Sequence, residues 1–338
     1  MKIVTRLAAS VLGLALLAAG PAHAEETTLI FATGNQNNNA VDNGFLLPWA
    51  ARINAAGKGI VHLDVREGVT VVNIFNAYDR VQADVVQISW TLFNYVNGKI
   101  KLAPVAALPF VDNAADGSVA LWRLYKTGML DSDFDQVIPL VLHAVSQSQL
   151  HTVKPLKDIF DWGGTKIVTP TKIMVDAAQL FNGSPLSLGS PQIYEAVQRG
   201  TAAGAILGWT GFPTFKLAEV TFWHVDEPLG TSAGMVFMSR AKFNALPEPV
   251  KKVLLDNSDE DQSRLFGAYW DHQNDMALAE VKAAPKQTVV SLTPEQRGQW
   301  LKKLEPATEA WTKETPNGAA IVAEYKKLLA EVEAAHQR

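Results

Sequence analysis

The sequence predicts an α/β protein folded as two lobes. Short apolar segments typical of buried strands alternate with segments of helical periodicity, which indicates a parallel sheet with helices on its faces. The chain has 338 residues, more than the roughly 250–300 that one hydrophobic core usually organises. Forty-eight per cent of its residues are hydrophobic and 19% are charged, which provides enough apolar material for two cores.

The first half of the chain contains three strand patterns. Val61, Leu63 and Val65 alternate with polar residues, the period of two expected of a half-buried strand. The predicted strands are 28–33, 60–65 and 83–88, and the predicted helices are 45–55 and a segment around Tyr78. A polar loop over 34–39 follows the first strand.

The middle of the chain repeats this alternation. Pro170 ends a strand, and Gly200 is a suitable C-terminal cap for a helix. The predicted strands are 166–169, 184–188, 202–207 and 235–238, and the predicted helices are 174–181 and 193–199.

A helical pattern without strand segments runs from Pro247 to about Ala284. A helix of that length measures on the order of 55 Å, so we expect it to brace both lobes. Thr293-Pro294 begins a further helix, with proline at its first position. Asn317-Gly318 separates that helix from a last, charged one.

The first 24 residues are typical of a secretory signal peptide. Lys2 and Arg6 precede an apolar run, and Ala22-His23-Ala24 is the small-x-small pattern that signal peptidase cuts. The run is shorter than the roughly 20 apolar residues that cross a bilayer, which disfavours the alternative of a retained anchor helix. We expect cleavage after Ala24 and a soluble mature protein in the periplasm.

Composition and motifs exclude several classes of function. The chain has no cysteine, so neither a disulfide nor a lipoprotein anchor is possible. Its formal net charge of −4 does not favour binding to nucleic acid or to an anionic membrane. The histidines lack metal-binding spacing, and no phosphate-binding glycine motif occurs. We expect no metal and no cofactor.

One motif resembles a hydrolase signature. Gly230-Thr231-Ser232-Ala233-Gly234 matches G-x-S-x-G, but a nucleophile elbow needs a helix after the serine. A strand pattern at 235–238 follows instead. We predict that the protein is not an enzyme, with a periplasmic hydrolase as the less favoured alternative.

Aromatic and polar residues near the ends of predicted strands are candidate ligand contacts. Ligands of open α/β sheets bind at the carboxyl ends of strands. Trp90 follows the strand at 83–88 and Trp209 follows the strand at 202–207, so both are expected at a cleft; core packing is the alternative. The other candidates are Phe110, Asn35, Gln36 and Asn37. Hinge packing explains Phe110 equally well, and a solvated turn explains the three amides.

Several stretches, in this order, resemble the substrate-binding proteins of TRAP (tripartite ATP-independent periplasmic) transporters. They are Tyr78-Asp79-Arg80-Val81, 83–88, Ala107-Leu108-Pro109-Phe110, 162–170, 194–204, 235–240 and Leu246-Pro247. The resemblance extends from about Thr27 to about Lys302. It implies a two-lobed periplasmic binding protein fold with a ligand cleft between the lobes, hinge strands and a long helix bridging both.

The sequence departs from this family at the ligand. Val168, next to Thr169, stands where the family normally has an arginine that pairs with the ligand's carboxylate, and Leu207 replaces a residue that is often polar. A valine cannot make that bidentate contact. Either Lys172, the nearest cation, replaces the arginine, or apolar and aromatic contacts hold the ligand. Arg66, swinging in from elsewhere, is a third possibility.

The resemblance implies a protein that captures a small organic ligand and delivers it to a TRAP-type membrane permease. Given Val168, we expect an organic acid with an apolar or aromatic body, and poor binding of small dicarboxylates such as succinate. A ligand-sensing module for a receptor is the alternative. We expect a monomer. The expected lobes, after the signal peptide 1–24, are 25–147 plus 232–260 and 148–231 plus 261–338.

Overall fold

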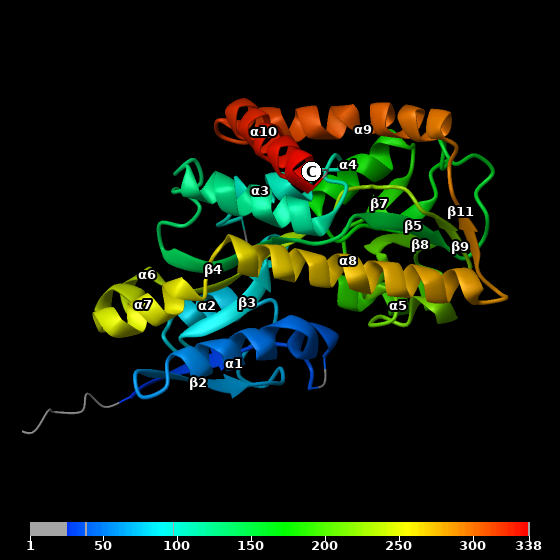
Figure 1. Cartoon of the computed structure of the whole chain (residues 1–338). Coiled ribbons are helices and arrows are strands. Elements are labelled where there is room, and N and C mark those ends of the chain that lie inside the picture. The colour runs from blue at the N-terminus through cyan, green and yellow to red at the C-terminus, as the bar shows by residue number, and fades with distance from the viewer. Residues whose placement is uncertain (1–25, 38, 97, 337–338) are drawn as a thin grey trace, which may run out of the picture.

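The computed structural model describes residues 26–37, 39–96 and 98–336. These residues form two β-sheets surrounded by helices (Figure 1). The predicted signal peptide and its cleavage site at Ala24 lie outside them. None of the helices in this part of the chain has the length and apolarity that crossing a bilayer requires.

The first sheet has five strands, in the order β2-β1-β3-β10-β4. Their bounds are β1 Thr27–Ala32, β2 Val61–Arg66, β3 Ile88–Leu92, β4 Val137–Ala144 and β10 Ala233–Ser239. The helices nearest to them in the chain are α1 Leu47–Ala56, α2 Ala77–Gln82, α3 Ala114–Lys126 and α6 Arg240–Ala245. Both β4 and β10 are buried along their whole length, and their apolar side chains belong to the larger core.

The second sheet has six strands, in the order β11-β9-β5-β8-β6-β7. Their bounds are β5 Ser148–Thr152, β6 Lys166–Val168, β7 Ser184–Leu186, β8 Gly204–Gly208, β9 Trp223–Val225 and β11 Thr288–Val290. Separate apolar clusters, one around Trp300 and one around Trp209, pack near α4 Lys172–Leu180 and α5 Ile193–Gln198.

Both sheets are mixed, so the prediction of parallel sheets is wrong in part. β10 runs antiparallel to β3 and β4, and β5 runs antiparallel to β8 and β9. β5 and β10 each enter their sheet directly after the chain has crossed from the other sheet, and each runs opposite to the strands on either side of it.

Two segments, 145–147 and 226–232, carry the chain between the sheets and lie side by side. Val145 N–H donates to Ser232 O at 3.0 Å, and Ser148 N–H donates to Gly230 O at 2.9 Å. The two crossings are therefore hydrogen-bonded to each other along their length. The lobe boundaries drawn from the sequence remain a proposal.

The predicted long helix is interrupted. α7 Glu248–Asp256 and α8 Glu260–Ala283 are separate helices. The prediction of one helix fails here because polar side chains compete for the backbone: Asn257 donates to Val253 O, and Asp259 caps α8 by accepting from Gln262 N–H. We call the part of the molecule built on the first sheet its first half and the part built on the second sheet its second half. α8 still bridges both halves, as Figure 1 shows, because it contacts α3 in the first and β11 in the second.

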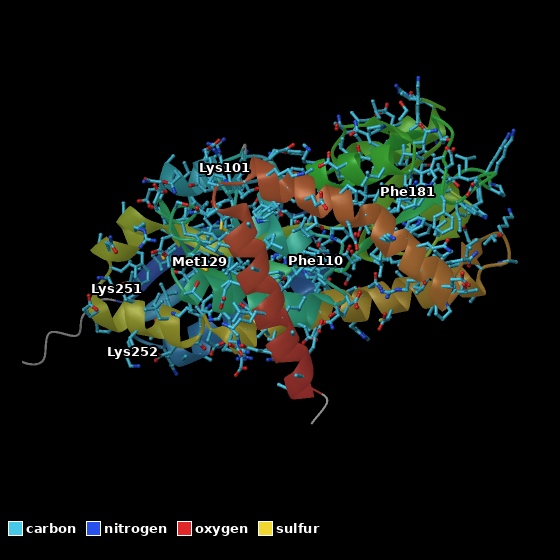
Figure 2. The ribbon with its side chains drawn as sticks, turned by 90° about the horizontal axis from the view of Figure 1, so that it is seen from above. Lys101, Phe110, Met129, Phe181, Lys251 and Lys252 are labelled. Atoms are coloured by element: carbon cyan, nitrogen blue, oxygen red, sulfur yellow. The ribbon has the colours of Figure 1, made fainter. Side chains whose placement is uncertain are left out.

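Two C-terminal helices cover the molecule, α9 Pro294–Glu314 and α10 Gly318–His336. Thr293 caps α9 in the predicted way, accepting from Gln296 N–H. α9 packs on α4, whereas α10 packs on α3, beside the first sheet (Figure 2). The hydroxyl of Tyr325 on α10 donates to Gly117 O on α3 at 2.9 Å.

Candidate functional site

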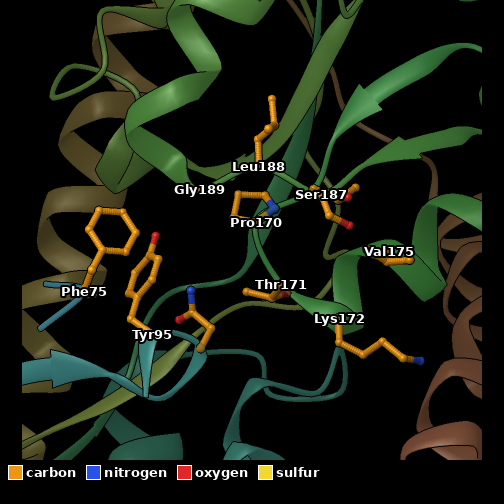
Figure 3. Close-up of a pocket in the computed structure, with 11 residues that line it drawn as sticks. Phe75, Tyr95, Pro170, Thr171, Lys172, Val175, Ser187, Leu188 and Gly189 are labelled. Carbon is orange, nitrogen blue, oxygen red and sulfur yellow. The ribbon is translucent and has the colours of Figure 1, made fainter. Parts of the chain in front are cut away.

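A cavity of about 420 Å³ lies between the two halves at the carboxyl ends of three strands (Figure 3). Asn94 and Tyr95 follow β3, residues 169–172 follow β6 and residues 187–189 follow β7. Phe75, which precedes α2, completes the wall from the first half. This is where open α/β sheets bind ligands, and the volume falls in the range of small-molecule sites.

A second cavity, of about 440 Å³, adjoins the first. Both cavities are lined by Asn94 and by residues 170–172, so both touch the start of α4. The second one extends to Trp311 and Glu314 at the end of α9. Among the described lining residues, the first cavity has a single charged side chain, Lys172, whereas the second has Lys101, Lys172 and Glu314.

Two aromatic rings form one wall of the first cavity. The rings of Phe75 and Tyr95 meet edge to face, with centroids 5.0 Å apart, and Figure 3 shows them on the side opposite Lys172. The Phe75 side chain is 54% exposed, unusual for so large an apolar ring. A Cβ added at Gly189 would lie 3.7 Å from Phe75 Cε1, so the two halves of the molecule meet here. A planar apolar group is the natural partner of such a wall.

Polar groups gather at the opposite wall, where α4 begins. Thr169 is 1% exposed, and its Oγ1 has no hydrogen-bond partner among the described residues. Thr171 is the N-cap of α4, and its Oγ1 accepts from Met174 N–H. The first amides of any helix have no acceptor inside it, so this wall offers several hydrogen-bond donors.

Lys172, the predicted cation, lines the cavity but is already paired. Its Nζ lies 2.7 Å from both carboxylate oxygens of Asp176 and 3.5 Å from Glu314 Oε2. Partial burial lowers the pKa of Lys172, but the hydrogen bonds and charges of these two acids outweigh it and raise this pKa above its usual value. The ammonium therefore stays charged and balanced by acids of its own chain.

The two tryptophans lie in cores rather than at the cavity. Trp90 lies inside β3 and is 4% exposed, so the prediction that it follows its strand is wrong; its Nε1 donates to His143 Nε2 at 2.9 Å. Trp209 does follow β8, but it is fully buried, and its Nε1 donates to Asp226 Oδ1 at 2.9 Å. Ligand contact by either ring stays a prediction, because reaching a ligand requires it to leave these partners.

At two positions where the family usually has a polar residue, this chain has an apolar one, and both apolar residues are buried. Val168 is fully buried and Leu207 is 8% exposed. Both belong to the apolar cluster around Trp209. In this structure they fill the core behind the strand ends, and Thr169 is the residue of that segment that lines the cavity.

The remaining candidates lie apart from the cavity. Asn35 donates to Asp42 Oδ1 at 2.6 Å, and Gln36 and Asn37 are exposed. Phe110 is half-buried, with its ring 6.2 Å from that of Tyr325. The structure therefore brings together Thr169 and Lys172 among the predicted residues. The sequence did not single out Phe75, Tyr95 or Asn94; the position of Asn94-Tyr95 after a strand is the one feature that points to them.

The motifs considered for catalysis and metal binding find no support. Ser232 is followed directly by β10 rather than by a helix, as the sequence predicts. In the described ranges, no three histidine, aspartate or glutamate side chains are grouped so that they could hold a metal ion.

The chain matches the family model of the bacterial extracellular solute-binding proteins, family 7, over residues 31–314. A protein of Comamonas testosteroni described as the outer membrane transporter protein TsaT is 25% identical over 316 residues, covering 89% of this chain and 90% of that protein. A solute-binding protein of Albidiferax ferrireducens is 22% identical over 251 residues, or 70% of this chain and 72% of that protein.

Solved TRAP solute-binding proteins have the same fold. One from Rhodoferax ferrireducens with copurified benzoate has a TM-score of 0.80 at 23% identity, covering 92% of this chain and 99% of that one. One from a marine metagenome with 3-hydroxybenzoate has a TM-score of 0.82 at 23% identity, covering 91% and 99%. One from Bordetella bronchiseptica with both mandelate enantiomers has a TM-score of 0.80 at 24% identity, covering 90% and 99%.

Proposed function

This chain belongs to family 7 of the bacterial extracellular solute-binding proteins, and from that premise we propose that it captures an aromatic monocarboxylic acid for a TRAP-type membrane permease. In this proposal the protein binds its solute for transport and does not transform it. What the sequence leaves open is the solute, and the cavity between the two halves is the feature that restricts it.

The composition of the cavity wall is the observation that carries this proposal. Phe75 and Tyr95 offer an aromatic surface on one side, and threonine hydroxyls and helix amides offer donors on the other. No arginine is found among the described lining residues. A ligand with one carboxylate and one ring matches both walls, whereas a second carboxylate would be buried against the aromatic wall without a cation to pair with it, which is costly.

The ligands of similar proteins support the same class of solute. Benzoate, 3-hydroxybenzoate and mandelate, found in the three structures above, each combine one ring with one carboxylate. In this chain Phe75 and Tyr95 provide the surface against which such a ring packs.

In this proposal the mature protein begins at Glu25, works in the periplasm as a monomer and closes about the paired crossings 145–147 and 226–232. A ligand that contacts both halves binds the closed form better and so shifts the population towards it. The permease then receives the closed, loaded protein.

Mass spectrometry of whatever co-purifies, followed by a thermal-shift screen, tests the proposal. A ligand at 100 times its Kd adds about 2.7 kcal/mol of stability, which shifts the unfolding midpoint visibly. We expect benzoate, 3-hydroxybenzoate or mandelate to raise the midpoint, and succinate and malate to leave it unchanged. A screen in which only dicarboxylates or sugar acids stabilise the protein would contradict the proposal.

A further inference from the structure

We infer that a ligand's carboxylate is held here without a cationic side chain, by the Thr169 hydroxyl and the N-terminal turn of α4. This inference rests on the proposed function and names the group that recognises the acid. It assigns to Thr169 the task that an arginine would perform at the neighbouring position, Val168.

Thr169 lines the cavity and has a buried hydroxyl that no described residue satisfies. It is 1% exposed and lines the cavity, and its Oγ1 lacks a partner among the described residues. Its backbone is fixed, because its N–H donates to Leu186 O at 3.0 Å. Burying an unsatisfied hydroxyl destabilises a protein, so a buried hydroxyl of this kind calls for an explanation, and we assign its missing partner to the ligand.

The start of α4 adds three more donors at the same wall. The Thr171 Oγ1 accepts from Met174 N–H at 3.3 Å, which leaves its own hydrogen available to a ligand. The amides of Lys172 and Ile173 are the first two of this nine-residue helix, and helix geometry gives them no internal acceptor. The helix dipole favours a negative charge at this end.

In this arrangement the Lys172 side chain does not bind the ligand's carboxylate. Its ammonium is held by Asp176, and Figure 3 shows the side chain extending away from Phe75 and Tyr95. We call Thr169, Thr171 and the first amides of α4 the donor wall. When a carboxylate is bound there, the ring attached to it faces Phe75 and Tyr95. Asn94 lines the cavity from the first half and offers an amide donor when the halves close.

One isosteric substitution tests this assignment. In T169V the hydroxyl becomes a methyl group, so the site keeps its shape and loses a donor. We expect calorimetric titration with benzoate to show at least a tenfold weaker Kd for T169V, and a Kd within threefold of wild type for T169S, which keeps the hydroxyl. The unfolding midpoint of ligand-free T169V should equal or exceed that of wild type, because no bond is lost.

Thr221 provides the matched control. It is fully buried, but its Oγ1 donates to Leu217 O at 2.9 Å, and it is absent from the cavity lining. T221V should lower the midpoint and leave the benzoate Kd unchanged, the reverse of T169V. Wild-type binding with an unchanged Kd in T169V would overturn this inference alone. A wild-type protein that binds no aromatic carboxylate would overturn the proposed function as well.

Discussion

Lys172 Nζ lies 2.7 Å from both carboxylate oxygens of Asp176, one turn further along α4. This ion pair determines whether Lys172 can replace the missing arginine as the partner of the ligand's carboxylate. A lysine whose charge faced the cavity would restore the usual pairing of a cation with the ligand's carboxylate. A charged lysine that is paired with an acid of its own helix leaves the carboxylate to be bound by hydrogen-bond donors. Arg66, the other cation considered, is paired with Asp64 and mostly exposed.

Replacing this lysine should therefore change little. Its side chain is 58% exposed and paired, and exposed ion pairs contribute little free energy. We expect K172M to alter the benzoate Kd by less than about threefold, because its backbone amide is unaffected. Calorimetric titration measures this. A loss of tenfold or more would show that Lys172 supplies the cation for the carboxylate.

The exposed Phe75 should affect binding far more than stability. F75L keeps an apolar side chain and removes the ring that meets Tyr95. Aromatic contacts contribute about 0.5–1.5 kcal/mol beyond area burial, so we expect a benzoate Kd roughly 2- to 12-fold weaker. Unfolding by urea should shift by less than about 0.5 kcal/mol.

Val71 is the control for Phe75, because it is 42% exposed and absent from the cavity lining. V71A should leave both affinity and stability unchanged. Equal effects of F75L and V71A on the Kd would remove Phe75 from the site.

The location of the site was more predictable than the side chains that line it. The rule that ligands bind at the carboxyl ends of strands leads to the cavity and to Thr169 and Lys172. It failed for Trp90 because β3 begins at Ile88, five residues later than expected. The apolar pattern at 83–88 does not reveal that Asp84 adopts a positive φ of 54°, which makes that segment a turn.

Two other features, the position of Trp209 and the strand β4, could not be predicted from local sequence patterns. Trp209 does follow a strand, but Asp226 draws its indole into the core, and no local pattern contains that information. β4 was missed because it is buried along its whole length, and a continuous apolar run does not distinguish a strand from a helix. The two-lobed α/β fold and a helix bridging both halves needed only alternation and length, and both are confirmed, although the bridging helix is α8 alone and not the whole of 247–284.

Trp209 should matter for stability. W209F removes the donor to Asp226 Oδ1, and hydrogen bonds to charged groups contribute about 1.5–3 kcal/mol. We expect urea denaturation to show a loss of that size. If the benzoate Kd instead weakened tenfold with stability intact, Trp209 would be a ligand contact, as the sequence predicts.

Three buried histidines make stability depend on pH. Burial lowers the pKa of His143 to about 3 and of His224 to about 4, and it holds the pKa of His151 well below its usual value. Below about pH 6.5 the unfolded chain binds protons at these residues and the folded chain does not. Stability is therefore full above pH 7 and falls as the pH decreases towards these values.

Urea midpoints at pH 7 and pH 5 test this sign. Each histidine contributes at most about 1.4 kcal/mol per pH unit, so a loss of several kcal/mol is expected at pH 5. Buried carboxyls with raised pKa values, such as those of Asp133 and Asp271, oppose the loss at lower pH. A midpoint at pH 5 equal to that at pH 7 would contradict the assignment of neutral buried rings.

A paired calorimetric titration of the mature protein with benzoate and with succinate distinguishes a site for one carboxylate and one ring from a dicarboxylate site. The donor wall at Thr169 accommodates a single carboxylate, and the Phe75–Tyr95 wall offers a second carboxylate no cation among the described residues. We predict one benzoate per chain, with succinate binding at least about 100-fold more weakly, roughly 2.8 kcal/mol. Tight binding of succinate with little or no binding of benzoate would contradict the account.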